Sequence, residues 1–328
     1  MTLIDGPYFE DLRVGQSFDD APPMTLTDGH AAAHQAIVGD RLRLPLDAQL
    51  SERVAGGRLA HPALVWNVAI GQSTVVTRKV KANLFYRGLM FHHAPMIGDT
   101  LRTTTTVVAL RQNRGKAGRA PTGLAVLRIV TVDQQDRRVL DFHRCAMISL
   151  RDSRAQTGFD DDSAAIGLVA DQDLTTSISG WRLADFEAAS SGLAFRDLQE
   201  GMRFGSAGAD VVTNAPELAR LTLNIAEVHH DSRAGDGRRL VFGGHTIALA
   251  LAQVSRCLPS VVTVPAWYSC DHTRPVYEGD TVRSEIAIER LRPLQSGGGL
   301  VDLRSLVSVD GADGPRAALD WRFVAVVA

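Results

Sequence analysis

The feature of this sequence that most limits its fold is an internal duplication. Three segments of the first half recur in the second half, in the same order: 9–18 as 195–204, 58–62 as 239–243, and 95–102 as 275–283. Matched positions lie 186 and 181 residues apart in the first two pairs, and 181 apart from Gly98 and Gly279 onward in the third, so only short insertions separate the two copies. A chain of 328 residues is long enough for two such domains, each of which can bury its own core.

Each copy has the same order of expected elements. A polar helical stretch comes first (28–38 and 215–224), an irregular loop follows, and an apolar helix comes next (62–76 and 244–258). Strands with alternating apolar residues complete each copy: 101–112, 123–134 and 139–150, then 281–291, 300–309 and 317–327. We therefore predict an α+β fold in which one long helix is wrapped by an antiparallel sheet, twice over.

The predicted domains are residues 1–151 and 185–328. The segment 152–184 between them contains Asp160-Asp161-Asp162 and scattered glycine, serine and threonine. That composition is typical of a surface linker, which we expect to be partly disordered.

Composition indicates a cytoplasmic protein. The net charge of −2 gives no reason to expect a nucleic acid or a membrane surface as partner, and no apolar run approaches the roughly 20 residues that span a bilayer. The N-terminus lacks the basic region and apolar core of a signal peptide. Three widely separated cysteines form no disulfide framework, and their odd number fits a reducing compartment.

The stretch 220–258 carries the clearest chemical pattern. Gly243 and Gly244 open the second apolar helix, so backbone N–H groups are unobstructed at the positive end of its dipole. Such an end suits a developing oxyanion. His229 lies upstream on a loop that can fold back over this helix start, which supplies a general acid and base. These residues predict an enzyme that activates a carbonyl group.

Several motifs of the chain resemble the MaoC-like acyl-CoA dehydratases. The similarity covers nearly the whole chain except the linker, and it is closest to the mesaconyl-CoA hydratase (β-methylmalyl-CoA dehydratase) branch. It is carried by four segments: 108–116, 223–229, 238–245 and 271–280. The resemblance implies two fused hot-dog domains, a double hot-dog. It also implies reversible addition of water to an enoyl-CoA thioester, with no metal and no redox cofactor.

Carried over by position, the resemblance assigns roles to four residues of the second copy. His229 is the expected acid and base, Asn224 stands in the place of the usual aspartate, and the N–H groups of Gly243 and Gly244 hold the thioester oxygen. The asparagine departs from the general pattern, although the mesaconyl branch shares it. Because an amide cannot act as an acid or a base, Asn224 can only position water. His229 must then transfer the protons alone or share this with Glu227.

The first copy lacks the same residues. Asp40 matches Asn224, but Pro45 stands where His229 has its counterpart, and Pro62, which has no N–H group, stands where Gly243 does. We therefore expect no second active site. The first copy is expected to shape the tunnel for the acyl and pantetheine portions, with the loop 41–57 closing that tunnel.

Four further residues are candidate substrate-binding groups: Glu227, Arg238, Arg239 and His245. Together with Arg233, the two arginines could bind CoA phosphates or a substrate carboxylate through forked hydrogen bonds, but a solvated basic turn is the better explanation for at least two of the three. A histidine at the position of His245 is more often structural, with a hydrogen bond to the substrate as the alternative. Adjacent His229 and His230 do not make a metal site, because neighbouring side chains point in different directions and no second cluster has zinc spacing.

The acyl group stays open at this stage. Short, branched and dicarboxylic acyl-CoA substrates are all compatible with the motifs. The alternatives are a (3R)-hydroxyacyl dehydratase of fatty acid metabolism, with a CoA or carrier-protein substrate, and an acyl-CoA-binding protein without catalysis. Hot-dog proteins commonly associate, so a homodimer of fused subunits is expected.

Overall fold

The computed structural model describes residues 5–115, 118, 120–168, 174–206, 208–234 and 237–328. Its strands form one twelve-stranded sheet, in which every recorded pairing is antiparallel, in the order β1-β4-β5-β6-β3-β9-β12-β11-β10-β7, with β2 and β8 beside β4 and β10. The strands are β1 (Ser17–Phe18), β2 (Met24–Thr25), β3 (Val80–Phe91), β4 (Thr100–Gln112), β5 (Thr122–Val132), β6 (Arg138–Ser149), β7 (Arg203–Gly205), β8 (Asp210–Val211), β9 (Val261–His272), β10 (Thr281–Pro293), β11 (Gly299–Val309) and β12 (Arg316–Val327).

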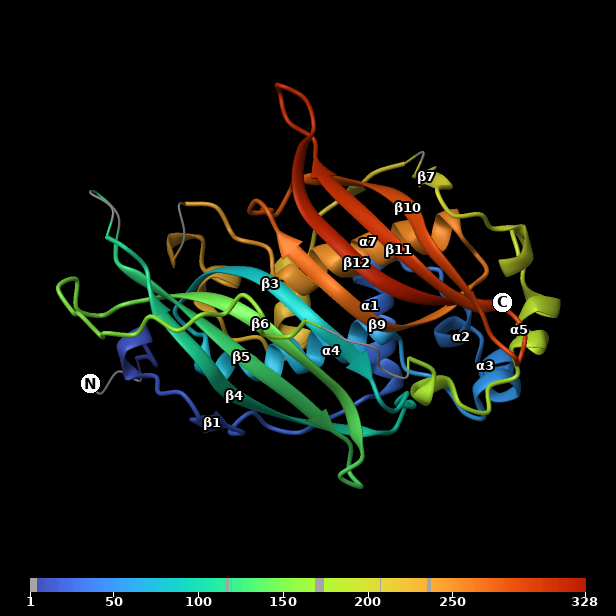
Figure 1. The fold of residues 1–328 in the computed structure, drawn as a ribbon, viewed down its shortest axis with the longest axis horizontal. Coiled ribbons are helices and arrows are strands. Elements are labelled where there is room, and N and C mark those ends of the chain that lie inside the picture. The colour runs from blue at the N-terminus through green and yellow to red at the C-terminus, as the bar shows by residue number, and fades with distance from the viewer. Residues whose placement is uncertain (1–4, 116–117, 119, 169–173, 207, 235–236) are drawn as a thin grey trace.

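Helices fill the concave side of this sheet and cover one of its ends (Figure 1). The α-helices are α1 (Asp28–Val38), α2 (Arg43–Leu46), α3 (Ala48–Ala55), α4 (Pro62–Gln72), α5 (Leu183–Ala189), α6 (Ala215–Leu221) and α7 (Gly243–Cys257). Short 3₁₀ turns are η1 (Phe9–Asp11), η2 (Ser73–Val76), η3 (Thr176–Ile178), η4 (Phe195–Asp197), η5 (Glu227–His229) and η6 (Ser232–Ala234). The duplicated α+β arrangement is the one that the sequence predicts.

The two copies join at the middle of the sheet and at its two central helices. Strands β3 and β9 pair antiparallel, with Tyr86 opposite Cys270, so both halves share one continuous ladder. Helices α4 and α7 pack against each other beneath it. Trp66 of α4 contacts Trp267 of β9, with ring centroids 4.8 Å apart, and both rings lie against Trp321. The copies therefore share one core.

The expected strands and helices are confirmed within a few residues, with one omission. Strands β3 and β9, which join the copies, were not among the predicted ranges. Their burial does not alternate, because register shifts interrupt β3 and the first seven residues of β9 are buried on both faces. Pro265 inside β9 also argues against a strand on sequence grounds. The apolar helix of the first copy also stops at Gln72 and continues as the 3₁₀ turn η2.

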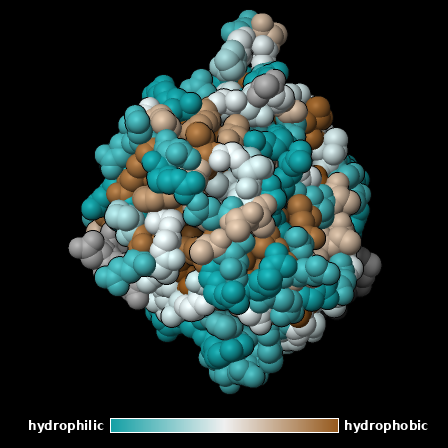
Figure 2. Space-filling view, turned by 90° about the vertical axis from the view of Figure 1, so that its right-hand side faces the viewer, coloured by the Kyte–Doolittle hydropathy of each residue, from teal (hydrophilic) through white to brown (hydrophobic). Residues whose placement is uncertain are grey.

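The expectation of a surface linker is wrong for its second part. Ile178, Trp181 and Leu183 are buried, and they pack in one apolar cluster with residues of α2, α3, β9 and β12. Residues 169–173 of the linker lie outside the described part. On the face at this end of the molecule, apolar residues are interspersed with hydrophilic ones (Figure 2).

The loop 41–57 also differs from its expected role. It forms α2 and α3, which pack against α5 and β9. The buried side chains Leu44, Leu50 and Val54 belong to the same cluster as the linker. This segment therefore packs with the linker, and none of its residues lines the cavity of about 1030 Å³ described below.

The described residues include all three cysteines and every helix named above. Cys145, Cys257 and Cys270 are all free thiols. Among the helices of the described ranges, none is long and apolar enough to cross a membrane. Those ranges also contain no group of three or more histidine, cysteine, aspartate or glutamate side chains that could hold a metal ion.

Candidate active site

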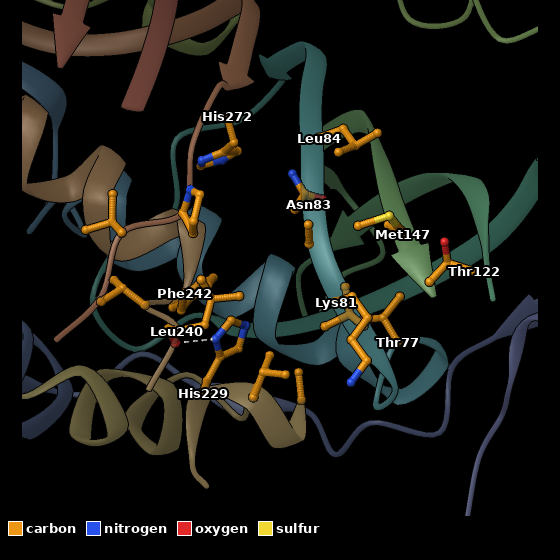
Figure 3. Close-up of a pocket in the computed structure, with 18 of the residues that line it drawn as sticks. Thr77, Lys81, Asn83, Leu84, Thr122, Met147, His229, Leu240, Phe242 and His272 are labelled. Atoms are coloured by element: carbon orange, nitrogen blue, oxygen red, sulfur yellow. Dashed lines mark hydrogen bonds between the residues drawn. The ribbon is translucent and has the colours of Figure 1, made fainter. Parts of the chain in front are cut away.

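A cavity of about 1030 Å³ lies between the two copies, which is at the upper end of the size range of small-molecule sites. The first copy contributes η2, β3, β6 and the turn between β4 and β5 to its wall. The second copy contributes the loop that carries Asn224 and His229, the start of α7, and the end of β9 at His272. Figure 3 shows His229, Phe242 and His272 of the second copy facing the β3 residues Lys81, Asn83 and Leu84.

His229 is held as a neutral base at the wall of this cavity. It is 8% exposed, and its Nδ1 lies 2.9 Å from the carbonyl oxygen of Leu240 (Figure 3). A carbonyl can only accept, so Nδ1 carries the proton and Nε2 keeps its lone pair. Burial lowers the pKa of His229 to about 4. The imidazole is therefore uncharged at neutral pH, with Nε2 available to take a proton.

Asn224 presents an unused donor to the same cavity. Its Oδ1 accepts a hydrogen bond from the N–H of Ala226 at 3.0 Å, which orients the amide. Within the described residues its Nδ2 is buried and has no hydrogen-bond partner. The backbone at Asn224 is fixed on both sides, since its N–H donates to Ala219 and its carbonyl accepts from Nε2 of His230 at 2.6 Å. A buried, unpaired N–H₂ group suits a bound water or substrate oxygen.

The start of α7 offers two free backbone donors. In the described part of the chain, the N–H groups of Gly243 and Gly244 donate to no protein acceptor. The N-cap residue Phe242 has no side-chain oxygen that could accept from them. A Cβ on Gly243 would lie 2.8 Å from the ring of His272, so only glycine leaves this corner of the cavity open. Gly244 lies off the cavity wall and packs on Asn67 of α4. The Gly243 N–H is thus the donor next to the cavity.

The chain as a whole is similar to known proteins. No family model matches the chain. It is 31% identical to the β-methylmalyl-CoA dehydratase of Chloroflexus aurantiacus over 321 residues, which are 93% of this chain and 89% of that protein. A solved putative MaoC domain dehydratase from the same organism matches with a TM-score of 0.83 at 27% identity, over 100% of this chain and 99% of the other. The chain belongs to the MaoC-like hydratases and dehydratases.

Two further similarities support membership of this family. The mesaconyl-CoA hydratase of Cereibacter sphaeroides is 28% identical over 319 residues, covering 94% of this chain and 91% of that protein. A conserved hypothetical protein of Mycobacterium tuberculosis, described as having a double hot-dog fold, matches with a TM-score of 0.92 at 54% identity, over 98% of both chains. The predicted double hot-dog fold is confirmed, and this MaoC-like protein is a hydro-lyase.

Of the four expected binding residues, only Arg238 lies on the cavity wall of this MaoC-like enzyme. It stacks on the ring of Tyr277, with its guanidinium carbon 4.1 Å from the ring centroid, and pairs with Asp280 at 2.7 Å. Arg239 instead pairs with Glu278 and does not line the cavity. Both arginines are therefore already partnered in the structure.

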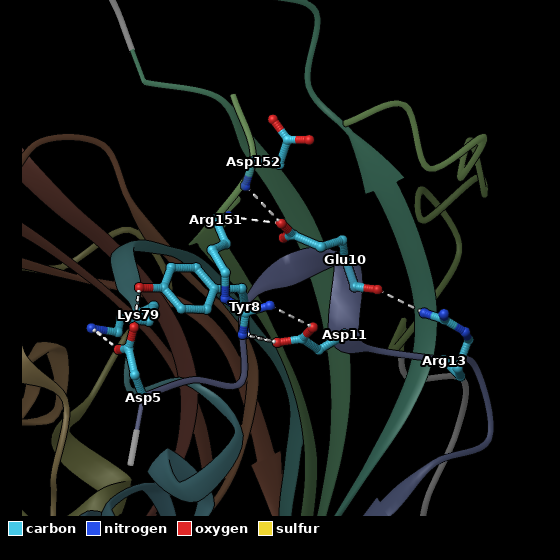
Figure 4. A network of polar contacts seen from close by, with 8 residues as sticks. All are labelled: Asp5, Tyr8, Glu10, Asp11, Arg13, Lys79, Arg151 and Asp152. Atoms are coloured by element: carbon cyan, nitrogen blue, oxygen red, sulfur yellow. Dashed lines mark hydrogen bonds and ion pairs between the residues drawn. The ribbon is translucent and has the colours of Figure 1, made fainter. Parts of the chain in front are cut away.

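Glu227 and His245 also lie away from the cavity wall. Glu227 pairs with Lys79 at 2.8 Å, and Lys79 in turn binds Asp5 in the N-terminal network drawn in Figure 4. His245 is buried in α7, and burial lowers its pKa to about 4. The structure thus brings Asn224, His229 and Gly243 together and leaves Glu227 and His245 outside.

Three cavity residues have no signal in the local sequence. Tyr86 of β3 and Arg144 of β6 are buried, His272 of β9 is half-buried, and all three line the cavity. The Tyr86 hydroxyl would lie 3.5 Å from a Cβ on Gly243, so it is close to the start of α7. Burial raises the pKa of Tyr86 to about 12, so this hydroxyl remains a donor at neutral pH. The sequence could identify these three residues as cavity residues only if the pairing of the central strands were already known.

The space beside Pro62, at the corresponding place of the first copy, is small. Pro62 is the first residue of α4, and the space beside it measures only about 10 Å³, enough for roughly one water. Ile178 and Trp181 of the linker line it. Asp40 faces His61 at 3.1 Å, while Pro45 and Asp47 lie in and after α2, where Asp47 caps α3. The linker therefore fills the place of a second site.

Proposed function

We propose that this enzyme catalyses the reversible hydration of an enoyl-CoA thioester to the 3-hydroxyacyl-CoA, and that the acyl group is short and dicarboxylic, as in mesaconyl-CoA. The observation that carries the reaction is the convergence of three unused groups on one cavity: Nε2 of His229, Nδ2 of Asn224 and the N–H of Gly243. The names of the two curated relatives support the choice of acyl group.

Each group has one role in the hydration direction. The Gly243 N–H, at the positive end of α7, binds the thioester oxygen and stabilises negative charge that develops there. Asn224 Nδ2 donates to the oxygen of a water molecule. Nε2 of His229 removes a proton from that water as its oxygen bonds to the β-carbon, and the double-bond electrons move towards the thioester.

The same histidine completes the reaction. Protonated His229 returns the proton to the α-carbon as the enolate collapses, so water adds across the double bond and His229 ends neutral. Positioned acid and base groups contribute about 10²–10⁴ in rate and one oxyanion donor about 10²–10³, so this set is sufficient without a catalytic carboxylate. Dehydration is the reverse sequence.

The test is a substrate panel with the wild-type protein. Loss of the enoyl-thioester absorbance is followed with mesaconyl-, crotonyl- and medium-chain enoyl-CoA, and the product is identified by mass. We expect turnover of mesaconyl-CoA to a product heavier by one water, with no release of free thiol. A preference for the medium-chain substrate would instead support the fatty acyl dehydratase. Release of free thiol would indicate a thioesterase, and binding without turnover would indicate an acyl-CoA-binding protein.

We also propose that the enzyme acts in the cytoplasm as a homodimer. The location rests on the sequence composition, and the dimer on the tendency of hot-dog domains to associate. Analytical ultracentrifugation of the full chain tests the second point, because a single species at the mass of one 35.4 kDa chain would contradict it.

A further inference from the structure

Arg144 is a buried cation with neutral neighbours. It lies on β6, is 4% exposed and lines the cavity. One nitrogen, Nη2, donates to the hydroxyl of Thr77 at 2.6 Å and to the carbonyl of Ser73 at 3.3 Å. Across the described residues, its Nε has no hydrogen-bond partner and no carboxylate pairs with the guanidinium. An arginine cannot lose its charge at working pH, so burial without an anion is unfavourable.

The fold itself does not require an arginine at this position. Arg144 is the cross-strand partner of Tyr86, which lies six residues after the start of β3. In the second copy, Trp267 lies six residues after the start of β9, and its partner is Phe323. Two buried aromatic side chains therefore satisfy the same ladder position in the second copy. The charge in the first copy needs an explanation other than packing.

The guanidinium lies close to the groups assigned to the reaction. Its partner Thr77 ends the 3₁₀ turn that begins at Ser73, and Thr74 of that turn accepts the N–H of Ile225, the residue after Asn224. Tyr86, beside Arg144, is also the residue whose hydroxyl approaches Gly243. The positive charge of Arg144 is near enough to contribute, after burial, to the low pKa of His229.

We propose that Arg144 binds a carboxylate at the far end of the acyl group and thereby selects dicarboxylic acyl-CoA thioesters. The inference rests on the proposed hydratase function and names the residue that determines its specificity. A carboxylate completes the unused Nε position and neutralises the buried charge, which a methyl group of the same size cannot do. The exposed Arg238 remains at the wall with its own partner Asp280.

Binding of two saturated thioesters tests the anchor without turnover. Succinyl-CoA and butyryl-CoA differ by a carboxylate in place of a methyl group, and neither has a double bond to hydrate. Calorimetry should show that the wild type binds succinyl-CoA roughly 10- to 100-fold more tightly, the range of one charge-assisted hydrogen-bonded contact. Arg144→Met should remove the preference, and Arg144→Lys, which keeps the charge, should retain part of it. A wild type without preference, or a preference that persists in Arg144→Met, overturns the proposal.

Arg238→Met is the matched control. Both thioesters carry the same CoA, so removing a charge from the cavity wall changes both affinities alike and leaves their ratio unchanged. Circular dichroism and thermal melting establish that each variant is folded, and Arg144→Lys gives a second readout if Arg144→Met is not.

Turnover separates selectivity from a general role at the thioester. Mesaconyl-CoA and tiglyl-CoA, its analogue with a methyl group in place of the carboxylate, form the pair. Arg144→Met should lower kcat/KM for mesaconyl-CoA by the factor lost in binding and leave tiglyl-CoA within a few-fold. An equal fall for both would mean that Arg144 acts on the thioester or on the fold. If succinyl-CoA binding depends on Arg144 but no substrate is hydrated, the hydratase function is rejected and the carboxylate-binding role of Arg144 stands. If mesaconyl-CoA and tiglyl-CoA are hydrated equally well, the hydratase function stands and the role of Arg144 is rejected.

Discussion

Gly71 in the first copy lies directly against Thr222 in the second: a Cβ on Gly71 would be 1.6 Å from the Thr222 carbonyl oxygen. Thr222 is two residues before Asn224, and Leu223 between them has a left-handed backbone with φ of 60°. The central helix of the first copy thus supports the loop of the proposed active site. Only glycine permits this approach inside an otherwise well-packed helix.

Gly71→Ala should damage both stability and activity. Although alanine favours a helix by up to about 1 kcal/mol over glycine, the clash with backbone costs about 1–3 kcal/mol and displaces Asn224. Denaturant unfolding and hydratase kinetics measure the two effects. Gly29→Ala in α1 is the control, since its Cβ meets only Thr27 Oγ1 at 3.6 Å and should leave both properties intact. A stable, fully active Gly71→Ala would refute the role of this contact.

Asn224→Ala should lower kcat for hydration more than it changes KM. The variant removes the Nδ2 donor that positions water, which is worth about 10–100-fold in rate if it equals one hydrogen bond of about 1.5–3 kcal/mol. Asn224→Asp tests whether an amide is needed, because a carboxylate accepts but does not donate when ionised. Steady-state kinetics of both variants decide the point, and wild-type rates in Asn224→Ala would exclude a role for this side chain.

Gly243→Ala should impair catalysis while the fold persists. Its Cβ would meet the His272 ring at 2.8 Å and occupy the corner of the cavity beside the free N–H. We expect kcat/KM to fall by about 10²–10³, the effect of losing one oxyanion donor. Gly205→Ala, where a Cβ meets nothing within 4 Å, should retain wild-type rates. If Gly243→Ala is as active as Gly205→Ala, the thioester oxygen is not held there.

The pH profile should report the low pKa of His229. The neutral imidazole is the active base, and neutrality is lost only as the pH falls through its pKa of about 4. An exposed histidine would titrate near 6.5, and kcat/KM would fall below that pH. We expect kcat/KM for mesaconyl-CoA to stay level between pH 8 and about pH 5.5. An inflection near 6.5 that disappears in a His229 variant would contradict the structure.

The sequence predicts the parts of this fold whose signals are local. Alternation locates β4, β5 and β6 and their counterparts in the second copy, and the apolar run after Gly243 locates α7. Strands β3 and β9 lack alternation, the first because of its register shifts and the second because its first seven residues are buried, so the sequence does not reveal them. The linker is hidden for another reason: Ile178 and Trp181 are isolated apolar residues in a polar segment, and only the tertiary structure shows that they fill a space beside Pro62.

The candidate site also has residues that the local sequence reveals and residues that only the tertiary structure reveals. Asn224, His229 and Gly243 stand in one stretch with a known resemblance, so sequence alone assembles them. Arg144 belongs to a strand and looks like any other surface arginine in the sequence. Its importance depends on the absence of a nearby carboxylate in the described structure, which is a property of many distant residues at once. Conversely, Arg239 and Glu227 look available in sequence but are paired with Glu278 and Lys79.

The most direct test of the account is hydration of mesaconyl-CoA by the wild type, His229→Ala and the control His92→Ala, measured side by side by enoyl-thioester absorbance. His92 follows the last residue of β3, Phe91, whereas the β3 residues that line the cavity lie between Val80 and Tyr86, so His92 should be dispensable. The account predicts a fall in kcat of about 10²–10⁴ for His229→Ala and wild-type rates for His92→Ala. A His229→Ala enzyme that hydrates mesaconyl-CoA within a few-fold of the wild type would contradict it.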